Sequence, residues 1–247
     1  MDSAEQAFQR SKIYRLFSYC FSYPEKDLLH FLSSGECLRE LELALLAYPQ
    51  GAGMAVPEGL FRELKKLTGE GELAIDEQIR DEHIRLFTLK SSCSPYETDY
   101  YRSFLAVFSA EDMADVAGFY RSFGMDFNLE RPDYIATELE FMHLAAMREA
   151  EALFRHESEK AALCRQIEKK FLEEHLGRWV SAFSEALAST GSRFYSSVAA
   201  ILDSWIDCDC RHFDVSPQKV TPFYMSMEEE EPSQLCEITN DIVRGDL

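Results

Sequence analysis

The sequence predicts an all-α fold, one globular bundle of about nine or ten helices. Apolar side chains recur at helical spacing along most of the chain. No segment shows the alternation of a half-buried strand or the rhythm of βαβ units, and no repeat of fixed period is found. Prolines, glycines and polar connectors separate the helical stretches.

The N-terminal third is predicted to contain several short helices. The first carries one apolar stripe, formed by Ile13, Leu16, Phe17, Cys20 and Phe21. It ends at Tyr23-Pro24, because a residue before proline disfavours the helical conformation. Further helices are predicted over residues 26–33, 36–47 and 58–67, with a loop over 48–57. Another stripe, interrupted at Ser91–Pro95, consists of Ile75, Ile79, His83 and Leu86.

Two helices are predicted in the centre of the chain. Ser109-Ala-Glu-Asp112 resembles a capping box and indicates a helix start, and Gly124 suits the end of that helix. Pro132 is expected to open a long helix, because proline is favoured in the first turn. The predicted buried face of this helix is Ile135, Leu139, Met142 and Ala146.

The clearest helical stripe lies in the C-terminal half and ends at Gly191. It consists of Leu172, Leu176, Trp179, Val180, Phe183 and Leu187. A last helix buries Phe194, Val198, Ile201, Leu202 and Trp205. We therefore expect one domain over residues 1–214 with a candidate hinge at 124–132, followed by an acidic, partly extended tail over 215–247.

The charge of the chain excludes one class of partner. Lys and Arg number 25 and Asp and Glu number 44, which gives a formal charge of −19. A general nucleic-acid binder needs clustered basic side chains instead. Residues 1–12 lack the apolar region of a secretory signal, and no uncharged apolar run approaches the roughly 18 residues of a membrane helix. A cytoplasmic protein without stable membrane insertion is expected.

Motifs of common enzyme classes are missing from the sequence. It has no P-loop and no G-x-S-x-G elbow, and its close glycine pairs lack the strand–turn–helix context of a dinucleotide site. The seven cysteines are irregularly spaced, unlike a disulfide framework, and Cys20 is expected in the core. We predict no catalytic residue and no cofactor.

Two patterns resemble metal-binding elements but are incomplete. Cys208-Asp-Cys210 has His212 nearby and lacks an obvious fourth ligand at short spacing. Glu140-Phe-Met-His143 is the Glu-x-x-His element of di-iron bundles, which requires a second copy that the sequence does not contain. A partly buried or surface histidine is the favoured interpretation of His143.

A third histidine, His175, lies one turn from Trp179 on the strongest amphipathic helix. We interpret it as a hydrogen-bonded histidine beside a core tryptophan, because a lone histidine lacks the partners of metal or nucleophilic chemistry. No metal site is predicted. An enzyme or metal carrier using these histidines, Glu140 or the cysteine pair remains the competing hypothesis, which metal analysis separates.

The most unusual composition is that of Ser94–Tyr101, with three tyrosines and two carboxylates directly after the serine and a proline. Tyrosine has an apolar body and a polar tip and therefore suits the rim of a peptide-binding site. The same side chains equally suit closing the core between two helices, and composition does not choose between the two.

Several short segments form a recognisable set in a fixed order. The two central segments are Ala114–Gly124 and Glu130–Phe141. The three outer segments are Ile13–Phe17 with Tyr23-Pro24, Arg85–Phe87 with Pro95–Glu97, and Phe171–Trp179 with Phe194-Tyr195. Together they resemble the TorD/DmsD/NarJ family of cytoplasmic maturation chaperones for molybdenum-cofactor oxidoreductases. The resemblance covers residues 10–212, and Tyr134 stands where many members carry a histidine.

The resemblance implies a TorD-like all-α protein that catalyses no reaction. It would bind the N-terminal segment of an apo catalytic subunit, often a twin-arginine signal peptide, until cofactor insertion and folding are complete. The acidic surface would attract the basic part of the segment, and an apolar groove would accept the rest. The residues expected around this groove are Tyr96, Glu97, Tyr100, Phe119, Tyr120, Asp133, Tyr134 and Glu138.

Two of these residues are expected to pair with guanidinium groups of the client. They are Asp133 and Glu138, and replacing them by Asn and Gln is predicted to weaken peptide binding at a nearly unchanged melting temperature. Asp133 also suits a first helical turn, and Phe119 and Tyr120 also suit the core.

The alternative function, favoured by Tyr134, is that of a NarJ-like assembly factor for a subunit that is not exported. The chain is expected as a monomer or a dimer domain-swapped across the connector 126–131.

Overall fold

The structure is a computed structural model, and it describes residues 3–49, 54, 59–68, 73–88, 93–101, 106–125 and 131–220. The predicted all-α class is confirmed for these residues. The α-helices are α1 (Ser3–Phe21), α2 (Lys26–Ser33), α3 (Glu36–Ala47), α4 (Leu60–Leu67), α5 (Leu73–His83), α6 (Ala106–Ser122), α7 (Ile135–Phe154), α8 (Ser158–Phe171), α9 (Gly177–Ala188) and α10 (Arg193–Phe213). Two π-helical turns, Ile84–Thr88 and Leu172–Leu176, and a 3₁₀ turn, Glu97–Tyr100, complete the description.

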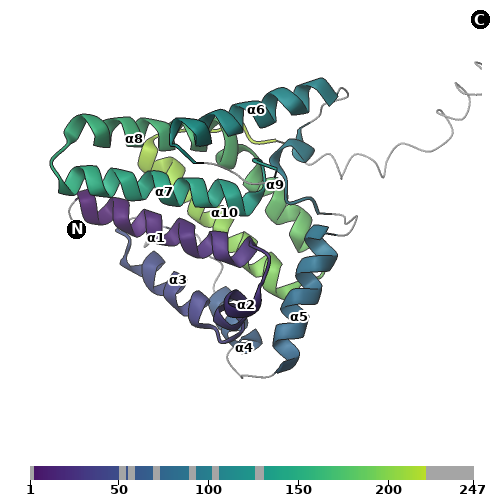
Figure 1. The fold of residues 1–247 in the computed structure, drawn as a ribbon. Helices are drawn as coiled ribbons and strands as arrows, with labels where there is room; N and C mark the ends of the chain where they lie inside the picture. The colour runs from purple at the N-terminus through teal and green to yellow at the C-terminus, as the bar shows by residue number, and fades with distance from the viewer. Residues whose placement is uncertain are drawn as a thin grey trace, which may run out of the picture.

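The helices stack in rows around an antiparallel pair, α1 and α7 (Figure 1). Helix α8 packs on the other edge of α7, α3 packs on α1, and α10 lies behind with α9. Helix α6 lies along the upper edge, and α5 stands at the side near the start of α7. The apolar stripes predicted for the first, the long central and the last two helices are all buried, and both tryptophans are fully enclosed.

Most predicted boundaries agree with the structure, and two are wrong. Helix α6 begins at Ala106, so the expected capping box at Ser109–Asp112 lies inside the helix. Helix α7 begins at Ile135, because Pro132 belongs to a turn before it and Tyr134 is the N-cap. Gly124 ends α6 as predicted, with a left-handed φ of 65° that favours glycine.

A buried ionic cluster, which the sequence did not predict, links four helices. The Arg10 guanidinium of α1 lies 2.5 Å from Glu149 of α7, 2.5 Å from Glu168 of α8 and 3.6 Å from Asp209 of α10. Burial raises the pKa of Glu168 to about 8, against the opposing charge of Arg10. Tyr14 donates a hydrogen bond to Asp209 at 2.6 Å. The cluster fixes how these helices pack, because breaking one buried pair leaves another charge uncompensated.

Residues 215–220 run back across the start of α9. Pro217 packs so closely on Gly177 that a Cβ atom there would collide with it and with the carbonyl of Leu172. Val220 donates a backbone hydrogen bond to Arg178 at 2.9 Å. The rest of the predicted tail, residues 221–247, and most of the candidate hinge, residues 126–130, lie outside the described residues.

Candidate functional site

The two motifs that contain most of the predicted site are joined by a short antiparallel bridge between Tyr96 and Tyr134. Glu97 N donates to Asp133 O at 2.9 Å, and Ile135 N donates to Pro95 O at 2.9 Å. The segment before α6 is thereby attached to the first residue of α7. Sequence motifs almost 40 residues apart form one local structure, which we call the bridge site.

The carboxylate of Asp133 is buried at the centre of the bridge site. It accepts hydrogen bonds from Thr98 N at 3.2 Å and Thr98 Oγ1 at 2.7 Å. Arg131 donates to it through Nε at 3.0 Å and through Nη2 at 2.7 Å. Every one of these partners is within the chain, so Asp133 closes the turn before α7 and presents no oxygen to solvent.

The second carboxylate, Glu97, is also buried and faces the π-helical turn after α8. His175 Nδ1 lies 3.1 Å from both of its oxygens, and the Tyr101 hydroxyl donates to it. Because a carboxylate only accepts hydrogen bonds, His175 carries a hydrogen on Nδ1, and in the neutral ring Nε2 is the acceptor. The predicted hydrogen bond of His175 and the predicted burial of Trp179 are confirmed.

Glu138 of α7 is fully buried and accepts a hydrogen bond from Trp179 Nε1 at 3.1 Å. Burial raises the pKa of Glu138 well above its ordinary value, and the charge of Glu97 raises it further. The neutral acid is therefore favoured. Tyr120 donates to Pro132 O at 2.7 Å, and burial raises its pKa too.

Two tyrosines form the exposed rim of the bridge site. Tyr96 and Tyr134 are half-buried, with ring centroids 5.6 Å apart. The Arg131 guanidinium lies 4.0 Å from the centroid of the Tyr96 ring and 3.2 Å from Asp99. The Tyr134 hydroxyl donates to Phe21 O at 2.6 Å.

The structure brings all eight predicted residues into one connected cluster. Phe119 packs against His175 and Phe141, Tyr120 packs against Phe141, and Tyr100 packs against Trp179. The buried members are Glu97, Tyr100, Phe119, Tyr120, Asp133 and Glu138. Sequence reasoning missed Arg131 and Thr98, although Arg131 stands two residues before Asp133, a spacing that lets a turn pair them.

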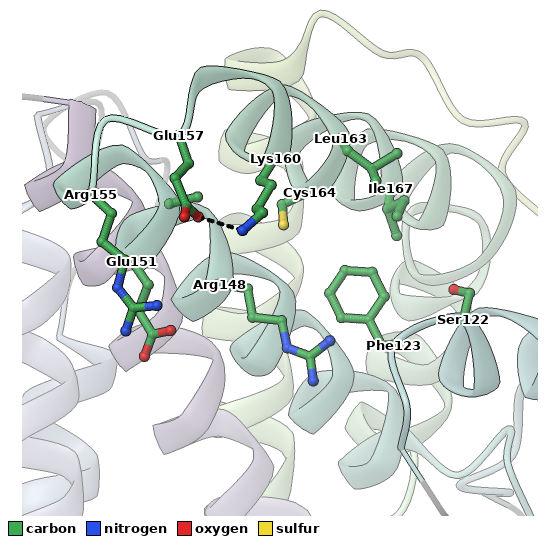
Figure 2. A pocket seen from close by; sticks show the side chains of 11 residues that line it. Ser122, Phe123, Arg148, Glu151, Arg155, Glu157, Lys160, Leu163, Cys164 and Ile167 are labelled. Atoms are coloured by element: carbon green, nitrogen blue, oxygen red, sulfur yellow. Dashed lines mark ion pairs between the residues drawn. The ribbon is translucent and has the colours of Figure 1, made fainter.

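A different surface, at the C-terminal end of α7, is hollow and apolar. The cavity there has a volume of about 350 Å³. Figure 2 shows that Phe123, at the end of α6, faces Cys164 and Ile167 of α8. Arg148 of α7 lies below, with its guanidinium 4.9 Å from the centroid of the Phe123 ring. The ion pair between Glu157 and Lys160, 2.9 Å long, closes the rim.

An adjoining cavity of about 570 Å³ lies between the start of α1 and the end of α7. Phe8 and Phe154 line it and are 47% and 80% exposed, and Leu163 beside the first cavity is 58% exposed. The two cavities share Glu151 and Arg155. We call this surface the α7-end groove. The sequence did not predict it, because these apolar residues fall outside the regular buried stripes.

The incomplete metal patterns have ordinary structural roles. His143 Nδ1 lies 2.8 Å from Ser11 Oγ, and burial lowers its pKa. Cys208 and Cys210 are buried thiols whose pKa burial raises, to about 12 for Cys210. Cys20 is in the core, as predicted.

The described helices include none long and apolar enough to cross a bilayer.

In sequence, the chain is 22% identical over 213 residues to a perchlorate reductase assembly chaperone protein of Dechloromonas aromatica (strain RCB), covering 84% of this chain and 91% of that one. A crystal structure described as a redox enzyme maturation protein from Archaeoglobus fulgidus matches 80% of this chain and 93% of its own, with 20% identity and a TM-score of 0.48.

A family model, described as the nitrate reductase delta subunit, matches residues 55–185. This range includes both strands of the bridge site, its buried carboxylates and most of the α7-end groove. The resemblance to the TorD/DmsD/NarJ chaperones is confirmed, and the chain belongs to the nitrate reductase delta subunit family.

Proposed function

We propose that this chain is a cytoplasmic assembly chaperone, without catalytic activity, for a molybdenum-cofactor oxidoreductase. It binds the N-terminal segment of the apo catalytic subunit and holds it during cofactor insertion, folding and assembly or export. Family membership and the similarity to a perchlorate reductase assembly chaperone support the general role. The absence of enzyme motifs from the sequence agrees with it.

The observation that carries the proposal is the α7-end groove. Large exposed apolar side chains around a cavity are typical of interaction surfaces, because water contact with them is unfavourable. Burying the side chains of Phe154 or Leu163 under a partner stabilises the complex by about 1.5–3 kcal/mol each. An apolar stretch of a client segment is complementary to the apolar side chains of this groove.

The bridge site remains the rival location for the client. Of the eight residues predicted from sequence, only Tyr96 and Tyr134 have substantial exposed surface. Asp133 and Glu138 would have to leave buried partners before they could meet a guanidinium group. The two locations lie at opposite ends of α7, a helix of 20 residues, and therefore about 30 Å apart.

The rim of the α7-end groove favours one type of client segment. Its charges have mixed sign, with Arg148, Arg155 and Lys160 beside Glu151 and Glu157. The ion pair of Glu157 with Lys160 leaves less free carboxylate for a pair of client arginines. An amphipathic segment of a subunit that is not exported suits such a rim better than a twin-arginine signal does.

Affinity purification of the tagged chain from its own cells tests the role. A molybdenum oxidoreductase subunit should co-purify, and a synthetic peptide of its N-terminal segment should bind the pure chain in calorimetry. If the recovered partners include no such subunit, or if its peptide does not bind, the proposed function is wrong.

Matched variants locate the binding surface. Phe154→Ser and Leu163→Ser should each weaken peptide binding by about tenfold, because each removes about 1.4 kcal/mol or more of apolar contact. Leu46→Ser is the control, since Leu46 lies on α3 and its exposed fraction of 75% falls between those of Leu163 and Phe154. If Tyr96→Ala weakens binding and the two groove variants do not, the client binds at the bridge site.

A further inference from the structure

Within the described part of the chain, one ring nitrogen of His175 has no hydrogen-bond partner. Its side chain is only 5% exposed, and Nδ1 is held by the Glu97 carboxylate. Nε2 is buried and has no hydrogen-bond partner among the residues that the structure describes. Buried polar atoms are nearly always paired, so such an atom in a well-packed region requires an explanation.

Two carboxylates that belong to different elements lie near the His175 ring. Asp115 Oδ2 of α6 lies 3.6 Å from His175 Nε2, too far for a hydrogen bond. Glu174 precedes His175 in the π-helical turn, and ligand atoms of all three residues lie within 4.8 Å of one another. Single π-helical turns inside helices are frequent at functional sites, and this one contains both Glu174 and His175.

We propose that Asp115, Glu174 and His175 bind one divalent transition-metal ion, with Zn²⁺ as the occupant. Imidazole and carboxylate ligands suit Zn²⁺, and three protein ligands leave a fourth position for water. A metal-binding histidine almost always donates its other N–H to a carboxylate or carbonyl group, which fixes the ring and the tautomer. Glu97 already makes this contact with His175 Nδ1, so in the neutral ring Nε2 carries the lone pair, 3.6 Å from Asp115 Oδ2.

The adjustment that binding requires is small. Ligands at about 2.0–2.2 Å from one ion lie closer together than 4.8 Å, so the carboxylates must move inward by about 1 Å. Asp115 and Glu174 are 61% and 42% exposed and have room to move. Glu174 would exchange its pairing with Lys170, now at 3.3 Å, for the ion.

An alternative is a protonated His175 that bridges Glu97 and Asp115 without a metal. In that state the second N–H would face Asp115 at 3.6 Å, beyond hydrogen-bond distance, and Glu174 would have no part in holding the ring. Metal coordination accounts for the orientation of the ring and for the unpaired nitrogen together. The ion would attach α6 to the connection between α8 and α9.

Titration of the metal-free full-length chain with Zn²⁺ and Co²⁺ tests the site. We expect one ion per chain in calorimetry, and a Co²⁺ absorption spectrum typical of nitrogen and oxygen ligands. Asp115→Asn and Glu174→Gln should each raise the dissociation constant at least tenfold. Glu173→Gln is the matched control, because it removes the same charge one residue away at an exposed position. Zn²⁺ should raise the melting temperature of the wild type and not that of Asp115→Asn.

His175→Gln should abolish binding while its amide keeps a hydrogen bond to Glu97. If this buried variant fails to fold, the two variants at exposed carboxylates still decide the question. Lack of saturable binding, or equal affinity in Asp115→Asn, Glu174→Gln and the wild type, would overturn the proposal. Thiolate charge-transfer bands with Co²⁺ would also overturn it, since they would assign the ion to cysteine.

Discussion

Replacing Asp133 by Asn should destabilise this protein strongly, in contrast to the sequence-based prediction of weaker peptide binding at an unchanged melting temperature. The carboxylate accepts two hydrogen bonds from Thr98 and two from Arg131. An asparagine amide places an N–H₂ group against at least one of these donors and removes the charge that pairs with Arg131. Segment 93–101 would then lose its attachment to the start of α7.

The magnitude follows from the burial of the two partners. Breaking a fully buried ion pair costs about 3–5 kcal/mol, and losing a hydrogen bond to a charged group costs about 1.5–3 kcal/mol. Since the Arg131 side chain is 38% exposed, water compensates part of the loss. We expect a decrease of about 2–4 kcal/mol in the free energy of unfolding. At about 2–4 °C per kcal/mol, this lowers the melting temperature by about 4–16 °C.

Urea denaturation followed by circular dichroism measures this effect, with Asp99→Asn as the control. Asp99 contacts the same guanidinium at 3.2 Å but is itself 39% exposed, so its loss should cost less than about 1 kcal/mol. The reasoning is refuted if Asp133→Asn unfolds at the same urea concentration as the wild type. A variant of unchanged stability that binds the client peptide less tightly would instead support the role inferred from sequence.

Three further predictions concern other parts of the fold. Burial raises the pKa of Glu168 to about 8, so the folded chain retains a proton that the unfolded chain releases, and stability should fall as the pH rises from about 4.5 to about 8. Urea midpoints measured across this range should change less in Glu168→Gln. Gly177→Ala should cost about 1–3 kcal/mol, measured by thermal denaturation, because its methyl group would collide with Pro217 and Leu172 O. Phe154→Ser should change the unfolding free energy by less than about 0.5 kcal/mol in the same assay, since Phe154 is 80% exposed.

Apolar periodicity was sufficient to predict the helices in which the spacing of apolar residues follows the period of an ordinary α-helix. Helices α2 and α3 begin and end at the predicted residues, because Pro24 and Gly35 punctuate clear stripes. The π-helical turn at Leu172–Leu176 was not predicted. One extra residue in a turn leaves the spacing of Leu172, Leu176 and Trp179 compatible with an ordinary helix, so the pattern cannot reveal it.

The start of α7 shows the limit of a local rule. Proline is favoured in a first helical turn, but Pro132 is needed in the turn that lets Asp133 reach Thr98 and Tyr134 pair with Tyr96. A contact with a segment 35 residues away therefore determined where the helix begins. Local sequence carries no information about such a partner.

The same limit applies to the candidate site. The sequence motifs predicted which residues gather there, but the role of each depends on burial, which is set by distant partners. Glu97 is buried against His175, 78 residues away, and Glu138 against Trp179, 41 residues away. Two carboxylates expected around the client groove are thus held inside, whereas Phe154 and Leu163, which fall outside the regular buried stripes, are exposed.

Burial also divides the acidic residues into two groups with different effects on binding. Burial raises the pKa of Glu168 and of Glu138, so these two carboxyl groups contribute less to the formal charge of −19 than exposed carboxylates do. Asp133 and Glu149 are compensated by Arg131 and Arg10. Attraction of a basic client segment therefore depends on the exposed carboxylates, whose field is screened by salt. Substituting a buried carboxylate should alter stability, whereas substituting exposed ones should alter the association rate.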